Sequence, residues 1–304
     1  MPEAPTPAWQ ELIDAFLDHE RAVGGFAAST LRHRDLYLRT YAAWCERAGG
    51  LAPADAGHDD LVAFMVAEAD RGIAASTRVA QLATLRRFHA WLVRTGRAGT
   101  DPTAGLESPT VRPPDIDVYR PAEVEQILSH TASLDDQRGR LRDVVVRSLR
   151  FTGMRSVELR TLRLDALDLA AGEARVRGKA ERWRTVVLPP PLLATLERFL
   201  DEVRPGLPDS PLLLSNPARL VTTEHRGFGP EAVHREVELA GRDAGVPGRH
   251  FPHRWRHTFA TELVRAGVDI HVVQRLLGHA SVQSTVHYTH LAVDDLKRSV
   301  AGLW

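Results

Sequence analysis

Apolar residues recur at helical spacing through the first hundred residues of the chain. Near the N-terminus they come at steps of three and four residues, which places them on one face of a helix: Trp9, Leu12, Ile13, Phe16 and Leu17. The tetrapeptide Ala-Ala-Ser-Thr then occurs twice, at residues 27–30 and 74–77, and its serines, Ser29 and Ser76, are each placed to cap the helix that follows. Residues 8–96 are therefore predicted to form a pair of helical hairpins.

The helical pattern stops between residues 97 and 120. This stretch is rich in glycine and proline, including Asp101-Pro102 and Pro113-Pro114, a composition typical of an exposed linker. Proline is tolerated in the first turn of a helix, so Pro121 is expected to open a new one. The sequence thus predicts a helical domain at residues 1–108, a linker at 109–120 and a second domain at 121–304.

The second domain is predicted to be mainly helical with one short β-hairpin. Two runs that suit strands, 174–178 and 185–188, flank a polar segment and place Lys179 near the hairpin tip. Helices are expected over 191–204, 229–245, 253–266, 269–277 and 281–290, followed by an amphipathic segment at 292–301. The predicted fold class is mainly α, with a small β-sheet or hairpin in the second of two domains.

Composition limits the class of protein. Forty-three per cent of the 304 residues are hydrophobic, which is enough for a sizeable core, and no apolar run is long enough to cross a bilayer. The N-terminus lacks the basic and apolar regions of a signal peptide, and Cys45 is the only cysteine, which excludes a disulfide framework within one chain. We therefore expect a cytoplasmic protein with no membrane contact.

Charge is distributed unevenly although it sums to zero. The 39 basic and 39 acidic residues balance, whereas a DNA-binding protein often carries a basic excess. Residues 138–163, however, hold eight Arg against two acidic residues, and residues 175–184 hold four Arg and Lys179 against one. Such a local patch either contacts phosphates or forms a solvated face.

Lysine is rare in this chain. Of the 39 basic residues only Lys179 and Lys297 are lysines. Arginine cannot give up a proton near neutral pH, whereas a lysine can be tuned to do so. Lys179 therefore stands out as a candidate for proton transfer, while Lys297, near the C-terminal end, fits a surface position.

Two segments offer cations for binding or protonating a phosphate ester. In residues 152–159, Thr-Gly-Met-Arg-Ser-Val-Glu-Leu, a glycine precedes Arg155 at a predicted helix start, where a guanidinium and backbone N–H groups can cradle a phosphate. At the hairpin tip, Lys179 can reach a DNA minor groove and protonate a leaving oxygen. Taken singly, such residues are more often solvated or held in salt bridges.

A third segment carries two histidines around an arginine. In His253-Arg-Trp-Arg-His257, helical spacing places His253, Arg256 and His257 on one face. The histidines also have the spacing of zinc ligands, but residue 254 is not Glu, so the H-E-x-x-H metalloprotease pattern fails. A structural zinc site or two partly buried histidines are the alternatives.

The fourth segment, residues 276–290, contains a candidate nucleophile. Gly278 is expected to end one helix and Ser281 to cap the next. His279 then lies in the turn between the helices and Tyr288 on the second of them. A single tyrosine is more often a packing or hydrogen-bonding residue than a nucleophile.

Taken in order, the four segments resemble the motifs of the tyrosine recombinase family, also called phage-type integrases, and most closely its Xer-like branch. The family carries Arg in T-G-[LM]-R-x-x-E-L, Lys in a β-hairpin, H-x-[LIV]-R-H, L-G-H, and Tyr nine residues after the histidine of L-G-H. The matching positions are Arg155, Lys179, His253, Arg256, His279 and Tyr288. Residues 86–92 and 101–109 resemble the family's core-binding domain, so the likeness spans nearly the whole chain.

Two positions depart from the family pattern. Trp255 stands where the family usually has an aliphatic residue, and it is expected to pack under the motif. Arg254 replaces an acidic or small residue, and it is expected to add a phosphate contact. Neither departure changes the chemistry that the resemblance implies.

The resemblance implies a site-specific DNA recombinase that cleaves and rejoins strands through a 3′-phosphotyrosyl intermediate on Tyr288. Arg155 and Arg256 would grip the phosphate oxygens and His279 would donate a further hydrogen bond. His253 would help deprotonate the tyrosine or hold the phosphate, and Lys179 would act as general acid. His257 and Glu158 would support these groups. No metal or cofactor is implied.

The resemblance also implies an architecture and partners. A core-binding SAM-like domain and a catalytic domain would clamp a double-stranded recombination site, as a homo- or hetero-tetramer, with a partner recombinase or an accessory protein as an option. Its setting would be the nucleoid, in chromosome-dimer resolution or in integration and excision of a mobile element. The alternatives are a type IB topoisomerase, a catalytically silent DNA-binding regulator and a histidine-based metalloprotein.

Overall fold

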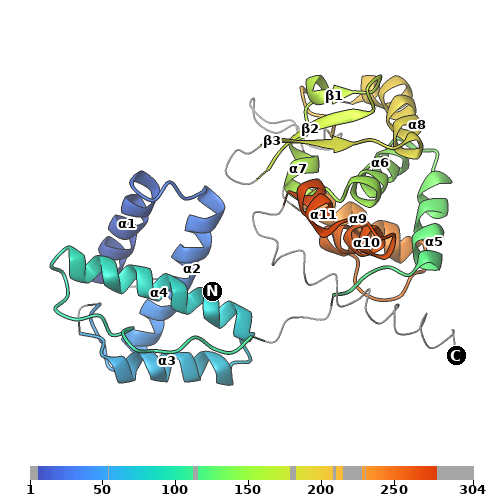
Figure 1. Ribbon diagram of the computed structural model, residues 1–304. Helices are drawn as coiled ribbons and strands as arrows, with labels where there is room; N and C mark the ends of the chain where they lie inside the picture. Colours follow the sequence, from blue (N-terminus) through green and yellow to red (C-terminus); the bar gives the residue numbers. More distant parts are fainter. Residues whose placement is uncertain are drawn as a thin grey trace, which may run out of the picture. The chain divides into compact units, whose positions relative to one another are not determined.

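The computed structural model describes residues 6–53, 55–111, 116–178, 183–207, 210–214, 228–229 and 231–278. The chain divides into two compact units, Met1–Pro114 and Asp115–Trp304, and each is described by itself (Figure 1). Both are built mainly of helices, and a small sheet belongs to the second, which confirms the predicted fold class. Among the helices of the described ranges, none is both long and apolar enough to cross a membrane.

In its described residues, the first unit packs four helices around an aromatic core. They are α1 (Pro7–Ala22), α2 (Ala28–Arg47), α3 (His58–Asp70) and α4 (Ala75–Arg94). The predicted apolar face of α1 is confirmed, because Trp9, Ile13 and Phe16 are all buried. The Trp9 ring lies edge-on to Tyr41 with the centroids 5.6 Å apart, and Phe16 meets Phe88 in the same way at 5.4 Å.

The predicted serine caps of the first unit are wrong. Helix α2 begins at Ala28 and α4 at Ala75, so Ser29 and Ser76 both lie inside the first turn. The N-cap residues are Ala27 and Ala74, neither of which makes a side-chain capping bond. Alanine has the highest helix propensity, and the alanine before each serine therefore joins the helix and moves its start toward the N-terminus.

His89 is a buried polar residue in the core of the first unit. It lies on α4 with an exposed fraction of 1%, and its ring meets that of Tyr41 edge-on at 5.8 Å. Neither ring nitrogen has a hydrogen-bond partner within the described part of the chain. Burial lowers the pKa of His89 to about 4, because the charged imidazolium would lose its hydration.

The first unit is therefore expected to lose stability in mild acid. The unfolded chain binds a proton at His89 near pH 6.5 and the folded chain only near pH 4, so the free energy of unfolding should fall between these values by up to about 1.4 kcal/mol per pH unit. Hydrogen exchange in α4, corrected for the intrinsic rate at each pH, measures this slope. His89→Leu should flatten it; an equal slope in that variant would show that other groups cause the loss.

Helix α6 (Gln137–Thr152) is the central element of the second unit. It packs against α5 (Pro121–Ala132), α8 (Pro190–Arg198), α9 (Ala232–Asp243) and α10 (Pro252–Arg265). Its valines Val144, Val145 and Val146 are fully buried, as expected for a helix with neighbours on several sides. The predicted helix start at Pro121 is confirmed, with proline in the first turn of α5.

A three-stranded antiparallel sheet covers one end of the second unit (Figure 1). Its order is β1 (Leu167–Asp168), β2 (Glu173–Arg177) and β3 (Trp183–Val187), and β2 and β3 form the predicted hairpin. Alternate residues of the hairpin, Ala174, Val176 and Val186, are buried in the core shared with α6. The two-residue strand β1 was not predicted, since it is too short to show alternation.

The C-terminal helices agree with their predicted ranges to within a few residues. Helix α8 continues as a π-helical turn at Phe199–Val203, α10 covers Pro252–Arg265, and α11 is Ile270–Leu277. Between α6 and the sheet lies the short helix α7 (Ser156–Arg160), which confirms the helix start predicted at Arg155. The predicted helix 281–290 and the segment 292–301 lie outside the described residues.

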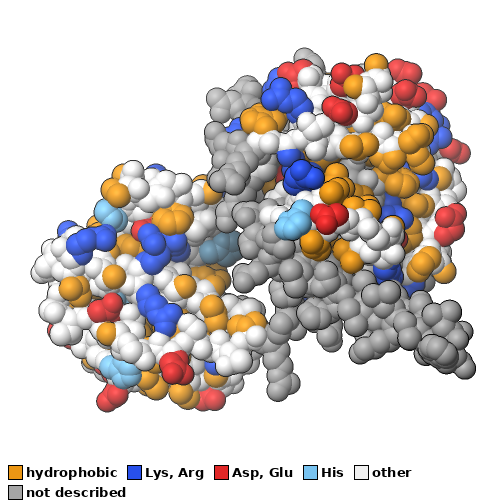
Figure 2. Space-filling model, viewed as in Figure 1, with side chains coloured by type: hydrophobic (Ala, Val, Ile, Leu, Met, Phe, Trp, Pro, Cys, Tyr) orange, Lys and Arg blue, Asp and Glu red, His pale blue; other side chains and the backbone are white. Residues whose placement is uncertain are grey.

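The basic stretch 138–163 is largely neutralised by acidic partners. Arg142 makes ion pairs of 3.0 Å with both Glu236 and Asp243 of α9, and Arg150 makes one of 2.7 Å with Glu262 of α10. Figure 2 accordingly shows basic side chains interspersed with acidic and apolar ones on the visible faces. Counting charges along the sequence therefore overestimates the local basic character of this segment.

Candidate active site

A glycine turn after α6 places Arg155 at the start of α7. Gly153 has φ +59°, and a Cβ added to it would lie 2.4 Å from Cδ1 of Phe259. A residue with a side chain is thus excluded on both conformational and steric grounds. Arg155 is the N-cap of α7; its backbone N–H donates to Oε2 of Glu158 at 2.8 Å and its guanidinium to Oε1 at 2.9 Å.

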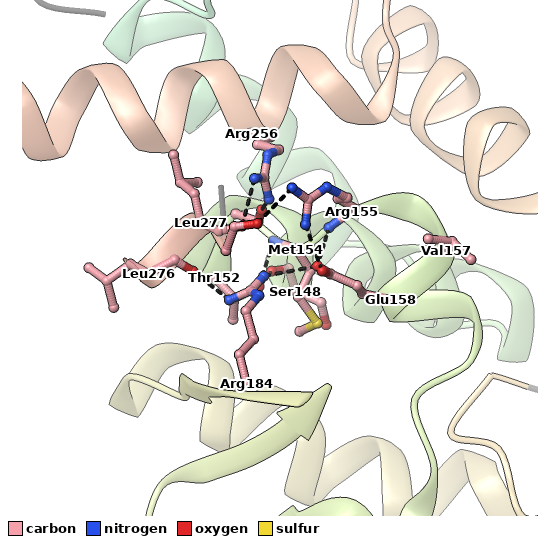
Figure 3. Close-up of polar contacts among 12 residues, drawn as sticks. Ser148, Thr152, Met154, Arg155, Val157, Glu158, Arg184, Arg256, Leu276 and Leu277 are labelled. Atoms are coloured by element: carbon pink, nitrogen blue, oxygen red, sulfur yellow. Dashed lines mark hydrogen bonds and ion pairs between the residues drawn. The ribbon is translucent and has the colours of Figure 1, made fainter. Parts of the chain in front are cut away.

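Glu158 is fully buried between two arginines. Besides Arg155, it accepts a hydrogen bond of 2.9 Å at Oε2 from Arg184, which reaches it from strand β3 (Figure 3). Burial alone would raise the pKa of Glu158, but the charges and hydrogen bonds of Arg184 and Arg155 outweigh burial and lower it. Glu158 is therefore ionised at neutral pH and anchors both guanidinium groups.

Arg256 joins two loops of the site from helix α10. Its side chain is buried, and it donates to the carbonyl oxygen of Gly153 at 2.6 Å and to that of Leu277 at 2.7 Å. Trp255, the next residue, packs in the core with its ring centroid 4.4 Å from that of Tyr119, as predicted. Trp255 thus packs α10 into the core, while Arg256 binds the turn after α6 and the end of α11.

Three arginines converge on the carbonyl end of helix α11. Gly278 ends the helix in the left-handed conformation, with φ +64°, as the sequence predicted. Three successive carbonyl oxygens there accept from three different elements: Leu276 from Arg184, Leu277 from Arg256, and Gly278 from Arg155 at 3.0 Å (Figure 3). The last carbonyls of a helix lack intrahelical donors and carry partial negative charge, so cations are favoured there.

The described site carries a net positive charge. Three guanidinium groups, those of Arg155, Arg184 and Arg256, face one carboxylate, that of Glu158, which leaves a formal charge of +2. Arg155 keeps 26% of its side chain exposed, and an arginine has five N–H donors, so its guanidinium can also bind an anion from solvent. The arrangement suits a phosphate diester.

His253 and His257 lie on the same face of α10, with ring centroids 6.0 Å apart. Loss of hydration and the charges of Arg256 and Arg155 lower the pKa of His253, and burial together with His253 and Arg256 lowers that of His257 to about 4. In the absence of a bound anion both rings are therefore neutral at neutral pH. Among the described residues no set of three potential ligands that includes this pair is placed to hold a metal ion.

The predicted phosphate contact of Arg254 is wrong. Its side chain is buried, makes an ion pair of 3.0 Å with Asp117 and lies 4.0 Å from the centroid of the Tyr119 ring. Helical geometry explains this orientation, because Arg254 is two residues from Arg256 and so points to a different side of α10. Arg254 thus connects α10 to the segment that precedes α5, through Asp117 and Tyr119.

The structure brings some predicted site residues together and leaves others outside its description. Arg155 and Arg256 meet at the end of α11, and His253 lies about one turn before Arg256 on α10. Lys179, His279 and Tyr288 lie outside the described residues. Sequence analysis missed Arg184, although one signal was present: it alternates with the buried Val186 on β3, and a charged residue at an inward position indicates a buried partner.

Comparison with known proteins defines the class. Residues 118–294 match the phage integrase family, and residues 13–96 match its N-terminal SAM-like domain. The tyrosine recombinase XerC of Mycobacterium sp. (strain KMS) is 33% identical over 294 residues, 95% of this chain and 96% of the relative. The tyrosine recombinase XerD of Listeria monocytogenes serotype 4b (strain F2365) is 30% identical over 290 residues, covering 94% and 96%.

A solved structure shares the fold over most of the chain. The XerH site-specific recombinase, bound to a palindromic difH substrate in a post-cleavage complex, matches with a TM-score of 0.77 at 19% identity, covering 96% of this chain and 84% of that one. The protein therefore belongs to the phage integrase family, the tyrosine recombinases. The predicted enzyme class, a site-specific recombinase that breaks and rejoins DNA, is confirmed.

Proposed function

We propose that this recombinase cuts DNA with the six residues Arg155, Lys179, His253, Arg256, His279 and Tyr288. The observation that carries the proposal is the convergence of Arg155 and Arg256 on the turn at Gly278, the residue directly before His279. Two guanidinium groups at one point can hold both non-bridging oxygens of a phosphate diester and stabilise the charge of its transition state.

In the proposed reaction, Tyr288 loses its phenolic proton, with His253 as acceptor, and its oxygen attacks the scissile phosphorus. A bond forms between the tyrosine oxygen and phosphorus while the bond from phosphorus to the 5′-oxygen breaks. Lys179 gives its proton to the departing 5′-oxygen. The 3′-phosphotyrosyl bond conserves the energy of the diester, so a 5′-hydroxyl from another strand can reverse the step without ATP.

The lowered pKa of His253 fits the role of proton acceptor. A histidine that is neutral at neutral pH can accept a proton, whereas an already protonated one cannot. A bound phosphate diester would reduce the repulsion from Arg155 and Arg256 and so raise the basicity of the ring. His279 would add one hydrogen bond to the same phosphate.

The substrate is proposed to be a double-stranded recombination site held by four protomers. Strand exchange between two duplexes requires four cuts, which a homo- or hetero-tetramer supplies, with a partner recombinase or accessory protein as an option. Residues 1–108 would form the core-binding domain, 109–120 the linker and 121–304 the catalytic domain. The enzyme would act in the cytoplasm, at the nucleoid, in chromosome-dimer resolution or in integration and excision of mobile DNA.

The proposal is tested by selecting a substrate from a randomised pool of duplexes. Each duplex carries a nick that traps a cleaved strand, and the wild-type chain is expected to enrich a defined sequence as a protease-sensitive covalent adduct. Supercoil relaxation of plasmids that lack this sequence would instead favour the topoisomerase alternative. Enrichment by binding without any adduct would favour the silent regulator.

A further inference from the structure

Arg184 lies in the site but is not one of the six proposed catalytic residues. Its guanidinium uses two different nitrogens: Nη2 donates to Oε2 of Glu158 at 2.9 Å, and Nη1 donates to the carbonyl oxygen of Leu276 (Figure 3). Its side chain is 12% exposed, so these contacts lie largely out of water. One residue of strand β3 thus holds both the carboxylate behind Arg155 and the last turn of α11.

The side chain of Arg184 passes close to the backbone of Gly278. A Cβ added to Gly278 would lie 2.7 Å from Cδ and 2.9 Å from Nε of Arg184, and 3.7 Å from Nη1 of Arg155. Gly278 is therefore needed for two reasons, its left-handed φ of +64° and the close passage of the Arg184 side chain. Glycine at position 278 therefore leaves room for the Arg184 side chain directly before His279.

Arg184 is also attached to the hairpin that bears Lys179. It is the second residue of β3, directly across from Val176 of β2, and the connection between these strands contains Lys179. Through one guanidinium, the base of this hairpin is tied to Glu158 and to α11. Arg184 thus links the hairpin of the proposed proton donor to the groups proposed to bind the phosphate.

We propose that Arg184 is a positioning residue for strand cleavage, which fixes the Arg155–Glu158 pair, the base of the Lys179 hairpin and the carbonyl end of α11 relative to one another. This inference rests on the proposed function of those residues. Lysine cannot replace it, because one ammonium nitrogen cannot occupy the places of two guanidinium nitrogens on separate acceptors. Misplacement of reacting groups by about 1 Å can slow a reaction on the order of a hundredfold.

Three variants test the proposal in the full-length chain: Arg184→Lys, Arg184→Met and the control Arg142→Met. Arg142 is matched to Arg184 in burial, at 11% against 12%, and likewise bridges two acceptors, Glu236 and Asp243. It lies ten residues before the end of α6, roughly 15 Å along the helix axis, and its side-chain hydrogen bonds within the described part of the chain go to α9. The probe is a nicked duplex selected by the wild-type chain from a randomised pool.

The expected result separates cleavage from binding. At saturating enzyme, Arg184→Lys should slow the first-order formation of the adduct by about 10- to 100-fold, while its Kd for the uncut duplex stays within about threefold of wild type. Arg142→Met should lower stability and leave the cleavage rate of the folded protein unchanged. A wild-type rate in Arg184→Lys, or equal rate losses in Arg184→Met and Arg142→Met, would overturn the proposal.

Hydrogen exchange in the free protein gives a second, independent test. Arg184→Lys should accelerate amide exchange at the end of α11, residues 274–278, whereas Arg142→Met should not. If the wild-type chain forms no adduct with any duplex, the proposed function fails and this measurement alone decides: unchanged exchange at α11 in Arg184→Lys overturns the positioning role, and faster exchange there supports it.

Discussion

Arg155→Ala is expected to slow strand cleavage by about 30- to 1000-fold, equivalent to ~2–4 kcal/mol in the chemical step. The side chain is the one guanidinium of the described cluster that both touches Glu158 and keeps a quarter of its surface exposed. Its loss removes donors that the transition-state charge would use. Single-turnover formation of the covalent adduct measures the rate, with uncut-duplex binding measured separately.

The chain offers a closely matched control for this variant. Arg120 is the N-cap of α5 and makes the same contacts to Glu123 that Arg155 makes to Glu158: a backbone hydrogen bond of 2.9 Å to one oxygen and guanidinium bonds to the other. Arg120→Ala therefore removes the same helix-start interaction in the same unit, and it should leave cleavage unchanged. Equal losses in both variants would show that helix capping, not phosphate binding, explains the effect.

Glu158→Gln is expected to destabilise the second unit by about 3 kcal/mol. The carboxylate is fully buried and is the counter-charge of both Arg155 and Arg184, so its neutralisation leaves two guanidinium groups in partial burial. Breaking a buried ion pair from one side costs about 3–5 kcal/mol, and the low end applies because Arg155 remains in contact with water. Urea unfolding followed by circular dichroism measures the change.

The control for Glu158→Gln is Glu123→Gln at the equivalent position of α5. Its nearer partner Arg120 is mostly exposed, with 75% of its side chain accessible, so water can replace the lost carboxylate. Its second partner, the buried Arg254 at 3.6 Å, keeps its ion pair with Asp117. A clearly smaller loss of stability is expected there. If both variants lose the same amount, the burial of the Arg155–Glu158–Arg184 cluster does not contribute to the stability of the unit.

Local patterns predicted those parts of the structure that depend on neighbouring residues. Helical spacing located the buried face of α1, strand composition located the β2–β3 hairpin, and glycine identified the end of α11 at Gly278. The ordered motifs indicated that Arg155 and Arg256 share one site, and the structure places both at the same turn. These features are set by short-range geometry, which a single sequence records.

The features that the sequence did not predict depend mostly on partners that are distant in the sequence. Arg184 finds its partner Glu158 26 residues away, and Arg142 finds Glu236 94 residues away, so neither pairing could be read from local charge. Arg254 was misassigned for the same reason: Asp117, which holds it, precedes it by more than a hundred residues. The predicted serine caps were wrong for a different reason. The helix propensity of Ala28 and Ala75 outweighed the capping signal of the serines that follow them.

Whether Tyr288 is the nucleophile is decided by finding the residue to which the cut DNA is attached. The wild-type chain is trapped on the selected nicked duplex, digested with trypsin and nuclease, and examined by mass spectrometry. Tyr37→Phe, which makes the same chemical change in the first unit, is the control. We expect a nucleotide attached to Tyr288, a free 5′-hydroxyl on the other fragment, and an adduct that persists in Tyr37→Phe and vanishes in Tyr288→Phe. An adduct that persists in Tyr288→Phe, or that maps to another residue, would contradict it.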